Sequence, residues 1–161
     1  MNQDILLEYK FALELLDAYD HQCIEEIDGV PSTGKLKYDE CIELISEMNF
    51  SSSVFGKEKE EGKLKGILSS IEQTFINNEI YPTLEEKAAN LLYFLIKDHP
   101  FVDGCKRIGA AIFLLYLKKN NAINRITNNT LVALVLLIAE SRAEDKENII
   151  KIVKSILCNY L

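Results

Sequence analysis

The clearest helix signal in this sequence lies at residues 83–98. Thr83 is followed three residues later by Glu86, the spacing of a capping box. Apolar side chains then recur at the three- and four-residue spacing of one helix face: Leu84, Ala88, Leu91, Leu92 and Leu95. His99-Pro100 ends the pattern, because proline disfavours helical geometry in the residue before it. We therefore predict a capped amphipathic helix that stops at residue 98.

The remaining pattern is also helical. Further helices are expected at residues 3–26, 38–48, about 65–76, 105–120, 128–141 and 143–160. Ser141 and Glu144 offer a second capping box. Residues 27–37 read as a loop, and the polar, glycine-containing stretch 49–66 as a surface hairpin or flap. The sequence thus predicts an all-α bundle of about six to eight helices with a small β-hairpin flap.

The length of 161 residues suits one domain with a core of its own. We expect a single domain over 1–161, with N-terminal helices in 1–48, the flap region in 49–66 and the core helices in 67–161. The longest apolar runs, Gly109–Leu117 and Leu131–Ala139, are far shorter than the roughly 20 residues that cross a bilayer. The chain begins without a signal-peptide pattern, and no cysteines have the CxxC spacing of a zinc site. A cytoplasmic, reduced protein without membrane contact is expected.

Charge is unevenly distributed along the chain. The net charge is −7, which argues against general nucleic-acid binding. Residues 1–96 carry 8 Lys/Arg against 19 Asp/Glu, whereas residues 97–125 carry 6 against 2. One basic segment in an acidic protein indicates a small anionic ligand rather than a long polyanion.

That basic segment contains the run His99-Pro100-Phe101-Val102-Asp103-Gly104-Cys105-Lys106-Arg107. The run leads into the N-terminus of the expected helix at 105–120, where free N–H groups and the helix dipole favour an anion. Gly104 allows close approach of the backbone to a ligand, Arg107 can bind a phosphate bidentately, and Lys106 adds a point charge. These residues predict a phosphate site.

Two further side chains of the run suit the chemistry of a bound phosphate. Asp103 supplies the oxygen that Mg²⁺ prefers, and His99 has the pKa range of a general base for a hydroxyl proton. Phe101 is expected to pack inward. Each residue alone also has an ordinary structural explanation, such as a helix terminator or a turn, so the prediction depends on their combination.

The run closely resembles the Fic/Doc signature His-x-Phe-x-(Asp/Glu)-(Gly/Ala)-Asn-(Gly/Lys)-Arg, with Cys105 as the one misfit. Residues 17–22, 73–75, 81–89, 128–129 and 138–141 resemble the C-terminal Fic/Doc domain of RhuM-type virulence-associated proteins. The resemblance implies transfer of AMP, or in Doc members of phosphate, from Mg-ATP to a hydroxyl group of a target protein. It also implies a flap at 56–66 that aligns a target segment by strand-like pairing.

The same resemblance implies the role of each site residue. His99 would be the base, Asp103 would hold Mg²⁺, and Gly104 and Arg107 would bind the ATP phosphates together with Lys106. A longer protein with a further N-terminal module is also implied. No convincing copy of the family's inhibitory Ser/Thr-x-x-x-Glu motif is present, so inhibition would come from that module or from a partner such as an antitoxin.

Three positions depart from the adenylylating members of the family. Lys106 replaces a glycine, and forcing a left-handed backbone on lysine costs about 1–2 kcal/mol. Ala110 stands where those members often have a second Arg. Both of these features are Doc-like and leave AMP and phosphate transfer open.

Cys105, the third departure, replaces the asparagine of the signature, and a thiol is only a weak donor. If the asparagine amide stabilises charge, its loss costs roughly 2–4 kcal/mol, by analogy with an oxyanion-hole donor. The alternative to an active transferase is therefore a catalytically degraded Fic fold that serves as a protein-interaction module.

Overall fold

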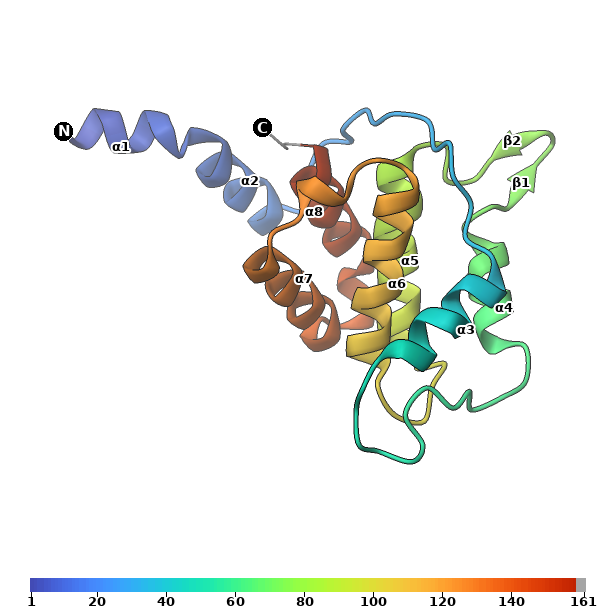
Figure 1. The fold of residues 1–161 in the computed structure, drawn as a ribbon. Coiled ribbons are helices and arrows are strands. Elements are labelled where there is room, and N and C mark those ends of the chain that lie inside the picture. Colours follow the sequence, from blue (N-terminus) through green and yellow to red (C-terminus); the bar gives the residue numbers. More distant parts are fainter. Residues whose placement is uncertain (159–161) are drawn as a thin grey trace.

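Two adjacent helices form the centre of the fold in the computed structural model, which describes residues 1–158 (Figure 1). They are α5 (Leu84–Lys97) and α6 (Cys105–Lys119), which pack side by side and are joined by the loop at residues 98–104. A Cβ atom at Gly109 of α6 would lie 3.3 Å from Leu95 Cβ, so the glycine permits this close packing. The other elements are arranged around the pair.

Six more α-helices and a hairpin complete the described residues. They are α1 (Asn2–Glu8), α2 (Lys10–Asp20), α3 (Tyr38–Glu47), α4 (Lys63–Ser70), β1 (Thr74–Phe75), β2 (Asn78–Glu79), α7 (Asn128–Glu140) and α8 (Lys146–Cys158). Short 3₁₀ helices η1 (Ile123–Arg125) and η2 (Ala143–Asp145) precede α7 and α8. The predicted all-α class with one small β-hairpin is confirmed.

The core lies between α5 and the helices that cover it. Leu91 and Leu92 of α5, Phe113 of α6, Ile138 of α7 and Val153 of α8 are fully buried in it. Burial of such side chains stabilises the fold by about 1.5–3 kcal/mol each. No helix among residues 1–158 is both long enough and apolar enough to cross a bilayer.

The hairpin lies in a different place from the predicted one. β1 and β2 pair antiparallel at 74–79, with Thr74 opposite Glu79, where the sequence pattern favours helix. The turn is made by Ile76 and Asn77, both with positive φ. Such turns normally favour Asn or Gly, and a β-branched residue there gives no signal that sequence reasoning would use. The helix predicted for 65–76 therefore ends early, at Ser70.

The helix predicted for 3–26 is divided and shorter. It breaks at Tyr9 between α1 and α2, and it ends at Asp20, after which Gln22 adopts a φ of 53°. Neither helix contains a buried residue, and Figure 1 shows α1 and α2 extending away from the bundle. Of the apolar stripe of this segment, Leu6, Tyr9, Leu13 and Leu16 are each 46–62% exposed, whereas Tyr19 is partly buried against the core.

One of the two predicted capping boxes forms in part. Thr83 Oγ1 accepts a hydrogen bond of 3.1 Å from Glu86 N, as predicted. The Glu86 carboxylate binds Lys154 instead of returning to the cap, so the reciprocal bond is missing. The box at Ser141 is wrong, because Ser141 Oγ donates to Ile138 O and α8 begins only at Lys146. Residues 159 and 160 of the helix predicted for 143–160 lie outside the described residues.

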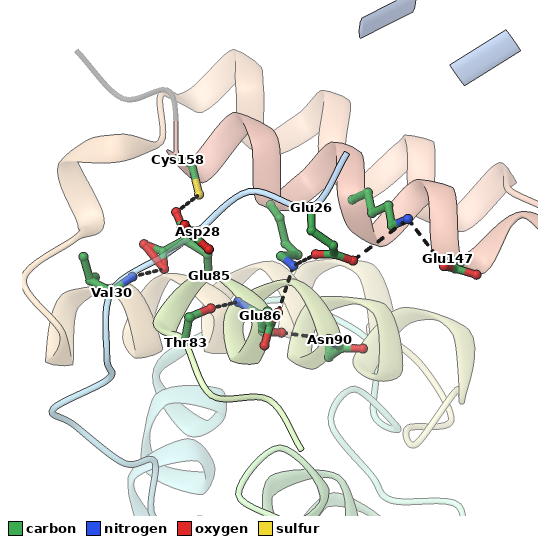
Figure 2. Close-up of polar contacts among 11 residues, drawn as sticks. Glu26, Asp28, Val30, Thr83, Glu85, Glu86, Asn90, Glu147 and Cys158 are labelled. Carbon is green, nitrogen blue, oxygen red and sulfur yellow. Dashed lines mark hydrogen bonds and ion pairs between the residues drawn. The ribbon is translucent and has the colours of Figure 1, made fainter. Parts of the chain in front are cut away.

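A polar cluster joins α8, α5 and the linker that follows α2 (Figure 2). Lys154 Nζ donates to Glu26 and Glu86, and Glu26 also faces Lys151 of α8. Burial lowers the pKa of Lys154, but the bonds to the two carboxylates outweigh burial and raise the pKa overall. Lys154 is therefore charged at neutral pH, and the linker is tied to the bundle by ionic hydrogen bonds.

Candidate functional site

The loop between α5 and α6 is shaped by its own sequence. Asp98 N bonds to Phe94 O at the end of α5, and His99 then adopts a left-handed φ of 46°. Pro100 prevents a return to the helix. His99 is exposed, whereas Phe101 is only 1% exposed and anchors the loop in the core, as predicted. The turn thus directs the histidine outward while the next aromatic residue holds the backbone.

Cys105 closes this loop. Its Sγ lies 3.3 Å from the carbonyl oxygen of Phe101, to which the thiol donates. The contact spans the four residues before α6. The thiol therefore makes a weak hydrogen bond within the loop, which is one of the contacts that an asparagine amide could make at this position.

Gly104 begins α6 in a left-handed conformation, with a φ of 97°. No side chain caps the helix, so the N–H groups of its first turn are left for solvent or a ligand. A Cβ at Gly104 would lie 2.5 Å from Cε2 of the Phe55 ring. Glycine is therefore required both by the backbone conformation and by the packing of Phe55.

Replacing Gly104 by alanine should destabilise the fold by about 2 kcal/mol or more, since left-handed strain of roughly 1–2 kcal/mol is joined by an overpacking cost. Thermal unfolding followed by circular dichroism measures the change. Gly62→Ala is the matched control, because Gly62 also has a positive φ but a Cβ atom added there would meet no other atom within 4 Å. Equal losses in the two variants would contradict the packing role of Phe55.

All six predicted site residues line one pocket of about 420 Å³. They are His99, Asp103, Gly104, Cys105, Lys106 and Arg107. Lys59, Lys97 and Glu140 also line it and are not among the predicted site residues. They lie in stretches that the sequence marks for other reasons, but their place in the pocket is not predicted because the fold brings them there.

Lys97 has a structural task as well. Its Nζ donates to the carbonyl oxygens of Ala139 and Ser141, at 3.0 and 2.5 Å. These carbonyls lie at the C-terminal end of α7, where a cation is favoured by the helix dipole. The α7 end is thereby fixed beside the pocket.

Arg107 is engaged with groups of its own chain. Its Nη2 lies 3.3 Å from Asp103 Oδ1, and its guanidinium carbon lies 4.4 and 4.9 Å from the ring centres of Phe50 and Phe55. Asp103 and Arg107 are each about 40% exposed, so this ion pair contributes little to stability. A ligand can therefore separate the two at low cost.

Segment 55–59 pairs through backbone hydrogen bonds with the loop between α5 and α6 (residues 98–104), which we call the motif loop. Gly56 N donates to Asp103 O at 3.1 Å, Val102 N to Lys57 O at 2.8 Å, and Lys59 N to Pro100 O at 2.9 Å. The predicted flap at 49–66 is thus no hairpin: it is a loop with two isolated bridges to the motif loop, followed by α4 from Lys63. Its strand-like pairing is used within the chain.

The donor set suits a metal that is shared with a ligand. Among residues 1–158 no group of three or more His, Cys, Asp or Glu side chains converges as a metal site. Mg²⁺ is commonly held by one or two carboxylates together with substrate phosphates. Asp103, which lines the pocket just before the uncapped start of α6, fits that arrangement.

Comparison with protein families gives one match. The family described as "Fic/DOC family" matches residues 14–117, more than half of the chain, and the match includes the whole run 99–107. No curated protein and no solved structure matched the chain.

Proposed function

Because the chain belongs to the Fic/DOC family, we propose that it transfers AMP, or in a Doc-like reaction phosphate, from Mg-ATP to a hydroxyl side chain of a target protein. The observation that carries the proposal is the convergence of His99, Asp103 and the uncapped end of α6 on one pocket. A base, a carboxylate and anion-binding N–H groups are the parts that such a transfer needs.

In the proposed reaction His99 accepts the proton of the target hydroxyl, and the hydroxyl oxygen attacks a phosphorus atom of ATP. Attack on the α-phosphorus breaks its bond to the bridging oxygen, releases pyrophosphate and leaves AMP on the target. Attack on the γ-phosphorus releases ADP and leaves phosphate. Mg²⁺ held by Asp103 would neutralise charge on the phosphates. Gly104, Cys105, Lys106 and Arg107 bind those phosphates through the first turn of α6 and its side chains.

The choice between AMP and phosphate depends on Lys106 and Ala110. Both lie within the regular helix α6, so Lys106 avoids the left-handed backbone that an additional anion nest would need. This conformation supports the Doc-like reaction, while the AMP reaction follows from the family as a whole. The two reactions leave different atoms of ATP on the target and can be separated directly.

A second candidate function is a catalytically degraded Fic fold that acts as a protein-interaction module. The bond from Cys105 Sγ to Phe101 O supports it, because the thiol is directed to the loop backbone and offers no amide to a phosphate. In that case the motif would be ordered but chemically weak.

Label transfer from ATP into bacterial lysate proteins tests the proposal. ATP is labelled on the α or the γ phosphate, and the native chain is compared with Cys105→Asn. Transfer of α label means adenylylation, and γ label alone means phosphate transfer. Activity only in Cys105→Asn would identify the cysteine as the lesion, and no transfer by either form would favour the interaction module.

Nucleotide binding provides a test that needs no target protein. Mg-ATP should raise the thermal unfolding temperature of the native chain, because a ligand that binds only the folded state stabilises it. Arg107→Ala should remove the effect. The absence of a shift in the intact protein would count against nucleotide use.

The finer features of the resemblance belong to the same proposal. We place the chain near RhuM-type proteins, supported by residues 73–75 and 81–89. A cytoplasmic location and a partner that restrains the site, either an antitoxin or an additional N-terminal module, follow from that placement.

A further inference from the structure

One cation of the pocket comes from a segment far from the motif in the sequence. Lys59 lines the same pocket as His99 and Arg107, although it lies forty residues before His99 in the sequence. Its backbone is fixed by the bond from Lys59 N to Pro100 O at 2.9 Å. The position of Lys59 beside the motif loop is therefore set by the pairing of segment 55–59.

The neighbour of Lys59 shows on which side the lysine lies. The Glu58 carboxylate accepts bonds from Tyr38 Oη at 2.7 Å and from Leu64 N at 2.8 Å, toward α3 and α4. Lys59, by contrast, is among the residues that line the pocket. Glu58 thus faces the helices and Lys59 faces the pocket.

The ammonium group of Lys59 is not used within the described part of the chain. Among residues 1–158 its Nζ forms no ion pair, side-chain hydrogen bond or ring contact, and the same is true of Lys106. Lys97 and Arg107, the other cations of the pocket, have protein partners. The pocket therefore contains two unengaged lysines on separate segments, Lys59 and Lys106, the second of them in the first turn of α6.

We propose that Lys59 is a phosphate-binding residue that holds the polyphosphate together with the N-terminus of α6. The inference rests on the proposed use of Mg-ATP and adds a ligand from segment 55–59 to those of the motif. A lysine ammonium is a strong point-charge ligand for phosphate oxygens. Bound polyphosphate would thus bridge segment 55–59 and α6.

Calorimetric titration with Mg-ATP and, separately, with inorganic tripolyphosphate tests the role of Lys59. Lys59→Ala should weaken both ligands by roughly tenfold, the effect of losing one charge-assisted hydrogen bond. The loss should be similar for the two, because Lys59 would contact phosphate and not the base. Lys59→Arg, which keeps the charge, should recover most of the affinity.

Lys57→Ala is the matched control. Lys57 is exposed, lies two residues away in the same segment and is absent from the pocket lining, while its backbone bond to Val102 N is retained in the variant. The affinity of the Lys57→Ala variant for Mg-ATP and for tripolyphosphate should stay within twofold of the native value.

Two results would overturn the inference, and they differ in what else they overturn. If the native chain binds both ligands and Lys59→Ala binds them as Lys57→Ala does, Lys59 has no phosphate role while the proposed function stands. If neither the native chain nor Cys105→Asn binds Mg-ATP or tripolyphosphate, the proposed function and the role of Lys59 both fail.

Discussion

His99→Ala should lower label transfer by about 10²–10⁴-fold, the range that a positioned general base contributes. The effect is expected in whichever form transfers label, the native chain or Cys105→Asn. His99 is held in an unusual left-handed conformation at the end of α5, two residues before the buried Phe101. Alanine removes the base but leaves this loop anchored, so the folded structure should persist. Initial rates of transfer at saturating Mg-ATP measure the loss.

The other histidine provides the control for this prediction. His21 lies exposed after α2, where its Nδ1 approaches Asp17 O at 2.8 Å and it forms no part of the pocket lining. His21→Ala should therefore leave the rate within twofold of the parent. A His99→Ala variant that retains more than a third of the parental rate would exclude His99 as the base, whatever the structure of the loop.

Lys87→Ala should lower the free energy of unfolding by about 3 kcal/mol, because a fully buried side chain leaves a cavity and the Tyr81 carbonyl loses a charged donor, while the pair with Glu79 adds little since Glu79 is 46% exposed. The Lys87 side chain is fully buried, and its Nζ donates to Glu79 Oε1 at 2.9 Å and to Tyr81 O at 2.6 Å. These bonds attach the β1–β2 hairpin and the chain after it to α5. Alanine would leave a buried cavity and a carbonyl without its donor. For a chain of this size the melting temperature should fall by about 6–12 °C.

Lys119→Ala is the matched control for Lys87→Ala. Lys119 also donates to a carboxylate, that of Glu40 at 2.7 Å, but both side chains are roughly a quarter to a third exposed. Its loss should cost less than about 1 kcal/mol because solvent screens the pair. Equal unfolding curves for the two variants, by denaturant titration, would show that burial of Lys87 adds nothing to its interaction.

The helices of the bundle can be predicted because the relevant signals are local. α5 has a capping threonine, a regular apolar stripe and a terminating proline, and its predicted ends agree with the structure to within a residue. The hairpin at 74–79 escapes prediction, since it depends on Ile76 in a turn conformation that this residue type rarely adopts. The break at Tyr9 is likewise invisible, because the apolar spacing continues across it.

Part of the site can also be predicted, because its signals too are local. The residues from His99 to Arg107 are contiguous, so a candidate site is visible from their spacing alone. Lys59 and the two rings that stack on Arg107 come from a segment with ordinary composition, and long-range pairing with residues 100–103 places them. The pair of Arg107 with Asp103 has the local i,i+4 spacing, whereas its contacts with Phe50 and Phe55 are a property of the folded chain that no local pattern encodes.

The unburied state of α1 and α2 has a consequence for amide hydrogen exchange. Isolated helices of 7 and 11 residues are marginal in water, and although Tyr19 near the end of α2 packs against the core, their backbone hydrogen bonds open at little cost to it. Their amides should exchange well before those of the bundle and should be the first sites of proteolytic cleavage. Amides of α5 and α6 should exchange only through global unfolding. The protection measured in α5 and α6 therefore reports the stability of the bundle, independently of the N-terminal helices.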